Sequence, residues 1–179
     1  EYPLPELKAQ LQNDPDPISR IAAVEALVKK GGLEVVKILS QALQEESFWG
    51  VRVEIARNLA TIKLDQAFSG LLTGLQDQDA RVRRATIEAL AGIKTLASYK
   101  ALKPIAEKGD ASYYTEAAAL RALGSVVTSL PEKEDKALKL LKSALKERQG
   151  WNEVVRAGAI AALSQIKTSE AALDMILDY

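Results

Sequence analysis

The sequence contains no cysteine and no histidine among its 179 residues. These absences exclude disulfides, thiol nucleophiles, imidazole bases and the commonest zinc ligands. Lysine and arginine together number 24, as do aspartate and glutamate, so no net charge draws the chain to nucleic acid or to an anionic membrane. No apolar run approaches the roughly 20 residues of a membrane-spanning helix. We therefore expect no catalytic activity, no metal, no cofactor, and neither nucleic acid nor membrane as a partner.

Enough apolar material is present for a substantial core, because 47% of the residues are hydrophobic. The sequence starts at Glu1 without a methionine. We expect it to be a domain excised from a longer protein, for which a cytoplasmic location is favoured.

Five related stretches recur along the chain, each with small and apolar residues at three- and four-residue steps, as in Val82, Ala85 and Ala89. This spacing predicts one helix in each stretch. When the stretches are aligned on a central leucine, successive copies are 32, 31, 33 and 40 residues apart, a period typical of solenoids. The aligned leucines are Leu27, Leu59, Leu90, Leu123 and Leu163.

Second amphipathic segments lie between these copies, and no strand pattern competes with them. They span residues 33–46, 64–77, 96–110 and 132–148, with short segments at 4–14 and 169–179. Asp16, Asp79, Ser112 and Asn152 stand where side chains cap the first turn of a helix.

The pattern predicts an all-α fold, a right-handed superhelix of about five helical pairs in which each pair is covered by its neighbours. We expect a single domain over residues 1–179. Its repeats are placed roughly at 1–30, 31–62, 63–94, 95–128 and 129–167, with a closing helix at 168–179.

An acidic residue precedes an arginine by six positions in the first three copies. The pairs are Asp14 with Arg20, Glu46 with Arg52, and Asp77 with Arg83. Together with the period, this spacing resembles HEAT repeats over essentially the whole chain. The resemblance implies that these side chains form a hydrogen-bonded ladder from one repeat to the next, for which the donor fork of arginine is suited. Copy four has Glu116 in place of the arginine, and copy five has Arg156 but Gly150 in place of the acid, so we expect the ladder to be broken there.

A narrower resemblance rests on three motifs, FWGVRVEIARNLATI, QDQDARVRRATIEALAGI and SYYTEAAALRALGSV. They are similar to the C-terminal HEAT-type region of bacterial aminopeptidase N-class metallopeptidases. This resemblance implies an accessory domain that packs on a catalytic domain and limits access to its cleft. The His-Glu-x-x-His zinc motif of those enzymes cannot occur in a chain without histidine. The alternatives are a free-standing adaptor, such as a phycobilin lyase or chaperone-type protein, and, less favoured, a HEAT-like DNA glycosylase.

Aromatic residues mark the predicted starts of several copies, at Phe48, Trp49, Tyr113 and Trp151. They are either exposed anchors for a protein, a peptide or a neighbouring domain of the same chain, or packing residues at the junction between repeats. Their recurrence favours packing, because a single binding site needs no aromatic in several units. We therefore expect both Trp49 and Arg52 to contribute to stability.

Two basic features have alternative interpretations. Arg81 to Arg84 could contact phosphate, but Asp77 and Asp79 lie immediately upstream and offset the charge. A lysine stripe from Lys133 to Lys146 could meet an acidic partner or a membrane. Acidic residues interrupt this stripe, and leucines occupy the opposite face of the same segment. A solvated outer face is therefore the favoured interpretation.

Overall fold

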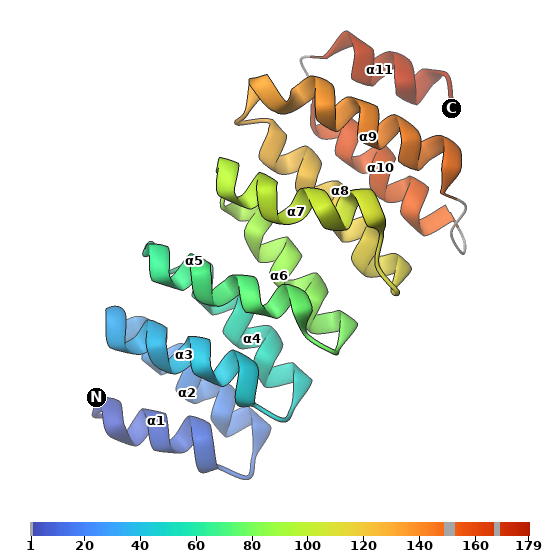
Figure 1. The fold of residues 1–179 in the computed structure, drawn as a ribbon. Helices are drawn as coiled ribbons and strands as arrows, with labels where there is room; N and C mark the ends of the chain where they lie inside the picture. The colour runs from blue at the N-terminus through green and yellow to red at the C-terminus, as the bar shows by residue number, and fades with distance from the viewer. Residues whose placement is uncertain (1, 149–152, 167–168) are drawn as a thin grey trace. The chain divides into compact units, whose positions relative to one another are not determined.

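The computed structural model describes residues 2–148, 153–166 and 169–179, and within these ranges every regular element is helical (Figure 1). The chain divides into two compact units, Glu1–Ala89 and Leu90–Tyr179. The sequence-based prediction of an all-α fold is confirmed.

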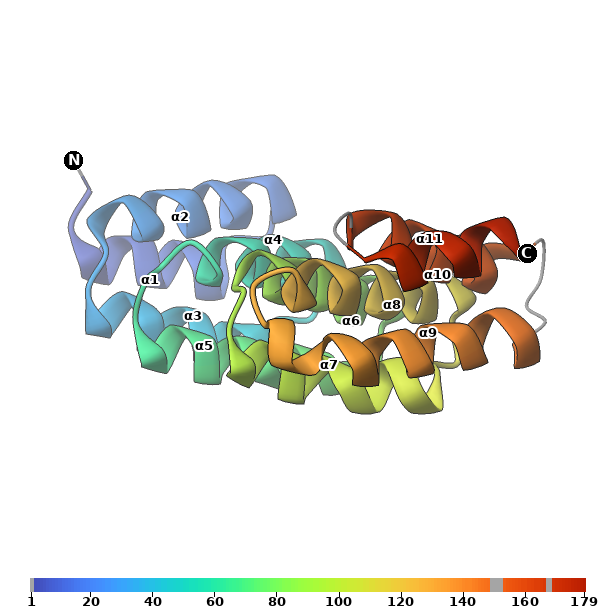
Figure 2. The same cartoon turned by 90° about the horizontal axis from the view of Figure 1, so that it is seen from above.

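Unit 1 consists of helical pairs arranged in two layers. Figure 2 shows α1, α3 and α5 in one layer and α2 and α4 in the other. The elements are α1 (Leu4–Asn13), α2 (Pro17–Lys30), α3 (Leu33–Glu45), α4 (Trp49–Leu59), α5 (Asp65–Leu72), the 3-10 helix η1 (Thr73–Gln76) and α6 (Ala80–Gly92), whose last turn extends beyond the unit. We call α2, α4 and α6 the second helices of unit 1, because each follows its partner in the chain.

Unit 2 repeats the arrangement, with α7 and α9 in one layer and α8 and α10 in the other (Figure 2). Its elements are α7 (Leu96–Lys108), α8 (Tyr113–Val127), the 3-10 helix η2 (Pro131–Lys133), α9 (Glu134–Glu147), α10 (Val154–Gln165) and α11 (Glu170–Leu177).

Helix starts follow the predicted caps. The Asp16 carboxylate accepts hydrogen bonds from the amides of Ile18 and Ser19, and the Ser112 hydroxyl accepts one from Thr115. The Asp79 carboxylate accepts the amide of Arg81 in the first turn of α6. Predicted cap Asn152 lies outside the described residues, as do Gly150 and Trp151.

The leucines that set the repeat register all lie in the core of their own unit. Leu27, Leu59, Leu90 and Leu123 are 0% exposed and Leu163 is 1% exposed. The leucine positions used to align the repeats are therefore buried positions in the structure.

One predicted helix differs in form. Residues 64–77 were expected to form one amphipathic helix, but α5 ends at Leu72 and the chain tightens into η1. The tightening occurs where Gly74 lies close to Thr86 of α6, since a Cβ on Gly74 would lie 2.2 Å from the threonine hydroxyl oxygen. The change from α-helix to 3-10 helix therefore coincides with the contact between Gly74 and Thr86. The spacing of apolar residues does not signal this contact.

Glycines bring α8 and α10 together in unit 2. A Cβ on Gly158 would lie 2.8 Å from both the Cα and the carbonyl oxygen of Ala117, and a Cβ on Gly124 would lie 2.7 Å from the backbone of Ala162. Both contacts are with backbone atoms, which cannot move aside as a flexible side chain can.

Replacing Gly158 with alanine should therefore lower the free energy of unfolding by about 1–3 kcal/mol, because overpacking separates α8 from α10. The matched control is Gly92→Ala, since no atom lies within 4 Å of a Cβ at that position. This control should be neutral or stabilising by up to about 1 kcal/mol. Urea unfolding measures both, and equal stability of the two variants would contradict close packing at Gly158.

Within residues 2–148, 153–166 and 169–179, no cluster of three or more acidic side chains is arranged to hold a metal ion. No helix in this part of the chain has the length and apolar character needed to cross a membrane.

Candidate functional site

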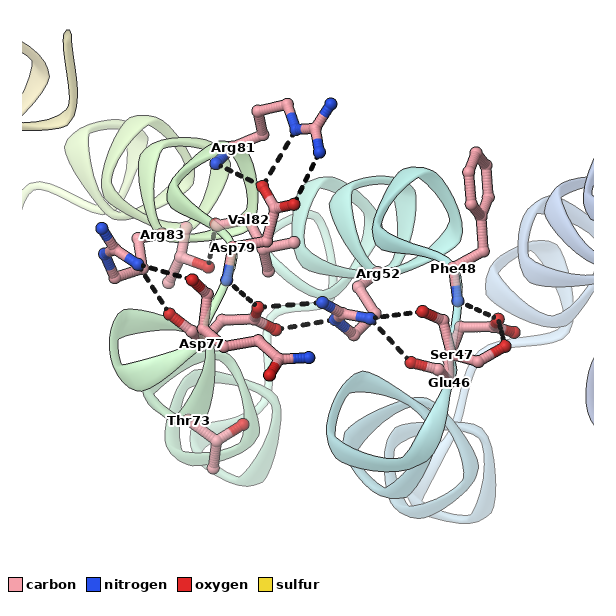
Figure 3. Close-up of polar contacts among 12 residues, drawn as sticks. Glu46, Ser47, Phe48, Arg52, Thr73, Asp77, Asp79, Arg81, Val82 and Arg83 are labelled. Atoms are coloured by element: carbon pink, nitrogen blue, oxygen red, sulfur yellow. Dashed lines mark hydrogen bonds and ion pairs between the residues drawn. The ribbon is translucent and has the colours of Figure 1, made fainter. Parts of the chain in front are cut away.

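Buried arginines connect the loops of successive helical pairs in unit 1. Arg52 donates from Nη1 to the carbonyl oxygens of Glu46 and Ser47, at 2.8 and 3.0 Å. Its Nε and Nη2 donate to the two carboxylate oxygens of Asp77, at 2.7 and 3.0 Å. Figure 3 shows the Arg52 guanidinium lying between these two loops. One side chain therefore satisfies the carbonyls of its own loop and the carboxylate of the next.

Arg20 makes the same set of contacts one repeat earlier. It donates to the carbonyl oxygens of Asp14 and Pro15, and its Nε and Nη2 each lie 2.9 Å from a carboxylate oxygen of Glu46. Arg83 makes the same contacts with its own loop, because it donates to the carbonyl oxygens of Asp77 and Gln78. The six predicted ladder residues of the first three copies thus come together in order along unit 1.

The acidic residues also hold the backbone of the loops. Asp14, Glu46 and Asp77 each accept the amide of the residue two positions further on, at 2.8–2.9 Å. Asp110 does the same in unit 2, accepting the amide of Ser112. Each carboxylate therefore fixes the residue from which the next helix starts.

These ion pairs are largely buried. The side chains of Arg52 and Asp77 are only 6% and 9% exposed. Hydrogen bonding to Asp77 raises the pKa of Arg52 above its ordinary value, so the guanidinium remains charged.

An aromatic cluster lies at the start of α4. Phe48 is the N-cap residue and 38% exposed, and the half-buried Trp49 is the first helical residue. Their ring centroids are 5.4 Å apart. The guanidinium carbon of Arg81, from α6, lies 3.6 Å from the centroid of the Trp49 ring, a cation–π contact.

Arg81 also forms an ion pair with Asp79, in which Nη2 of the guanidinium lies 2.7 Å from a carboxylate oxygen (Figure 3). Hydrogen bonding to Arg81 lowers the pKa of Asp79 to about 2. The aspartate is therefore ionised at neutral pH and held against its partner.

A groove of about 390 Å³ lies beside this cluster, and we call it the Trp49 groove. Its lining includes Ile21 of α2, Trp49 and Val53 of α4, and Ala85 of α6, together with three arginines. Each of these arginines has a carboxylate partner. The pairs are Arg57 with Glu54, Arg81 with Asp79, and Arg84 with Glu88.

The other predicted interface aromatics are Tyr113 and Trp151. Tyr113 is the first residue of α8, in unit 2, and is 47% exposed. Trp151 lies outside the described residues.

The family model for HEAT repeats matches residues 4–91 and again 36–124, which together cover more than half of the chain. This chain belongs to the HEAT-repeat family. No curated protein matches its sequence significantly.

Solved structures share the HEAT fold at low sequence identity. A chain in the complex of CpcE and CpcF of phycocyanin lyase from Nostoc sp. PCC7120 has a TM-score of 0.61 and 22% identity, over 99% of this chain and 70% of that chain. Human deoxyhypusine hydroxylase in complex with glycerol has a TM-score of 0.52 and 18% identity, over 97% of this chain and 88% of that chain. An engineered protein also has a TM-score of 0.52, with 19% identity over 97% of this chain and 50% of its own. At these identities the likeness concerns the fold alone.

Copy four contains a reversed HEAT ion pair where we expected an interruption. Glu116, which replaces the ladder arginine, accepts a hydrogen bond at 2.8 Å from Arg148, which directly follows α9. Arg148 also donates to the carbonyl oxygen of Glu107. The expectation of a broken ladder was therefore wrong for Glu116. Arg148 could not be found from the sequence by the fixed spacing between acid and arginine. It corresponds instead to Glu46 and Asp77, because all three directly follow the helical segment that opens a helical pair.

Arg156 departs from the ladder. It pairs at 2.9 Å with Glu153, three residues earlier, and lies 5.5 Å from the centroid of the Tyr179 ring. Its Nε atom is buried without a hydrogen-bond partner in the described part of the chain. Arg156 therefore stands at the predicted position in the repeat, but among the residues that the structure describes it does not make the bidentate contact with a carboxylate that Arg20 and Arg52 make.

Replacing Arg52 with alanine should lower the free energy of unfolding by about 3 kcal/mol, because the nearly buried Asp77 carboxylate and two loop carbonyls lose their donors. The control is Arg57→Ala, which removes an arginine of the same helix whose side chain is 57% exposed. Exposed pairs contribute little, so this control should lose less than about 1 kcal/mol. Urea unfolding gives both values, and similar losses would argue against a structural role for Arg52.

A double-mutant cycle tests the reversed pair. Glu116→Arg and Arg148→Glu should each destabilise unit 2 by about 2 kcal/mol or more, because each places like charges together in a nearly buried contact. The double variant restores opposite charges in the order found in unit 1 and should recover most of the loss. Additive losses in the double variant would show that the two side chains are not coupled.

Proposed function

We propose that this chain is a non-catalytic HEAT-repeat scaffold that binds a protein or peptide through the Trp49 groove. The single observation that carries the proposal is the stacking of Arg81 on the half-buried Trp49 ring beside an open groove. Tryptophan and arginine are the side chains most enriched at the energetic centres of interfaces.

The chemistry of the groove favours an uncharged, apolar or aromatic side chain as the bound group. Its arginines are already paired with carboxylates, so an incoming acid would have to compete with Glu54, Asp79 and Glu88. Val53, Ala85 and Ile21 provide apolar surface next to the indole. A partner that covers this surface gains hydrophobic contact without breaking the ion pairs.

The same geometry argues against the glycosylase alternative. That activity needs an acid available beside the aromatic cluster, but Glu54, Asp79 and Glu88 are each paired with an arginine. Asp79 holds Arg81, which contacts the Trp49 ring. The pKa of about 2 makes Asp79 a weak base at neutral pH.

The sequence motifs that resemble the aminopeptidase N-class region are the support for an accessory role in a zinc metallopeptidase. On this proposal the partner is a neighbouring domain of the same chain. The sequence of the full-length protein tests it, because a His-Glu-x-x-His motif upstream of Glu1 is required.

The free-standing adaptor is the second candidate, and the fold shared with a protein in the CpcE–CpcF complex supports it. That protein assembles with another chain, as an adaptor does. Here the Trp49 groove would bind a segment of a separate protein.

Selection of peptides against the whole chain tests the binding function. A displayed library of random peptides is selected on the wild-type protein, and affinities are measured by calorimetry. Trp49→Ala should weaken binding of the selected peptides by about tenfold or more, because it removes the central aromatic surface. In a Trp151→Phe background Trp49 is the sole tryptophan of the sequence, so its fluorescence should change on binding.

Leu33→Ala is the matched control, since Leu33 is a large apolar side chain of unit 1 that is 46% exposed and does not line the groove. It should leave affinity unchanged. Thermal melts accompany both variants, and we expect Trp49→Ala to melt a few degrees earlier as its contact with Arg81 is lost. Selected peptides that bind Trp49→Ala as tightly as wild type would refute the groove as the binding site.

A further inference from the structure

A second groove, different in charge, lies between α7 and α9 in unit 2. It measures about 530 Å³, and we call it the basic groove. Lys103 of α7, Lys136 and Lys139 of α9, and Arg148 after α9 supply four cations, whereas Glu107 is the one acid on its lining.

Two of these cations have partners within the unit. Lys103 forms an ion pair with Glu107, and Arg148 pairs with Glu116. Lys136 and Lys139 are exposed, and no carboxylate in the described part of the chain pairs with either of them. The groove therefore carries two positive charges that no ion pair among the described residues offsets.

The helix geometry explains why the lysines collect here. Leu138, Leu141 and Leu145 form the buried face of α9, so the lysines between them face outward. The sequence predicts that the lysine stripe is a solvated outer face of α9. Two of its members, Lys136 and Lys139, also line the basic groove between α9 and α7.

We propose that the basic groove binds an acidic segment of a partner protein, independently of the Trp49 groove. Lysine offers a flexible point charge that meets carboxylates in many orientations. Lys136 and Lys139 are separated by about 4.5 Å along the helix axis, and alternate side chains of an extended peptide by about 7 Å. Flexible lysine side chains bridge this difference, so two acids at alternate positions can be paired at once.

The other lining residues favour a peptide over a phosphate backbone or a membrane surface. Glu107 is paired with Lys103, and its carboxylate oxygens can accept hydrogen bonds from the amides of a peptide, donors that a phosphate backbone lacks. The partly exposed Leu140 offers apolar contact inside the groove, which a peptide side chain can cover. A flat anionic membrane would meet the exposed lysines of α9 without entering the concavity.

The test uses a fluorescein-labelled peptide of alternating glutamate and glycine, with a glutamine–glycine peptide as the uncharged comparison. Fluorescence anisotropy should show the whole chain binding the glutamate peptide at low salt, more weakly as salt rises, and not binding the glutamine peptide. Lys136→Glu with Lys139→Glu should weaken binding by about tenfold or more.

The matched control reverses two other exposed lysines, Lys29 and Lys30 of α2, and changes the net charge equally. This control and Trp49→Ala should both bind the glutamate peptide as wild type does, which separates the basic groove from the Trp49 groove. Circular dichroism confirms that each variant remains folded.

The proposal fails if the wild-type chain does not bind the glutamate peptide, or if both lysine reversals weaken binding equally. It also fails if vesicles containing phosphatidylserine, or duplex DNA, bind more tightly than the peptide and lose binding in the Lys136 and Lys139 variant. Those results would assign the lysines to a membrane or to nucleic acid.

Discussion

The interaction on which unit 1 depends is the buried arginine fork that links one interhelical loop to the next. The ends of helices leave backbone carbonyls and amides without partners, and a buried loop must satisfy them. Arg52 supplies donors to two carbonyls of its own loop and to both oxygens of Asp77. Asp77 in turn accepts the amide of Asp79, at the start of α6. Loop closure, helix initiation and attachment of the next repeat therefore share one set of hydrogen bonds.

The reversed pair in unit 2 shows which part of this chemistry is required. Glu116 cannot donate to loop carbonyls, but Arg148 donates both to the Glu116 carboxylate and to the carbonyl oxygen of Glu107. A guanidinium still joins a carboxylate to a carbonyl, although the two charged residues have exchanged positions. The junction therefore contains one guanidinium paired with one carboxylate in a largely buried contact. Which of the two positions carries the positive charge can differ.

Features that depend on residues within one repeat could be predicted from the sequence, whereas contacts between residues of different repeats could not. The core register was readable because Leu27, Leu59 and Leu90 recur with the period of the fold and are all buried. The acid–arginine spacing lies within one repeat, so it too was visible. The stacking of Arg81 on Trp49 and the pairing of Glu116 with Arg148 join residues about one repeat apart, and no local pattern signals them. The narrowing of α5 into η1 likewise accompanies the contact of Gly74 with Thr86.

In α6, helical phase separates the arginine that holds a loop from the arginine that lines the Trp49 groove. Successive residues of a helix are rotated by about 100°, so residues two positions apart point to nearly opposite sides. In α6, Arg83 donates to carbonyls of the preceding loop, whereas Arg81 covers Trp49 beside the open groove. The same residue type at neighbouring positions thus has two roles. Under our proposal, a change at the position of Arg81 would alter binding at the Trp49 groove while the hydrogen bonds of Arg83 to the loop remain.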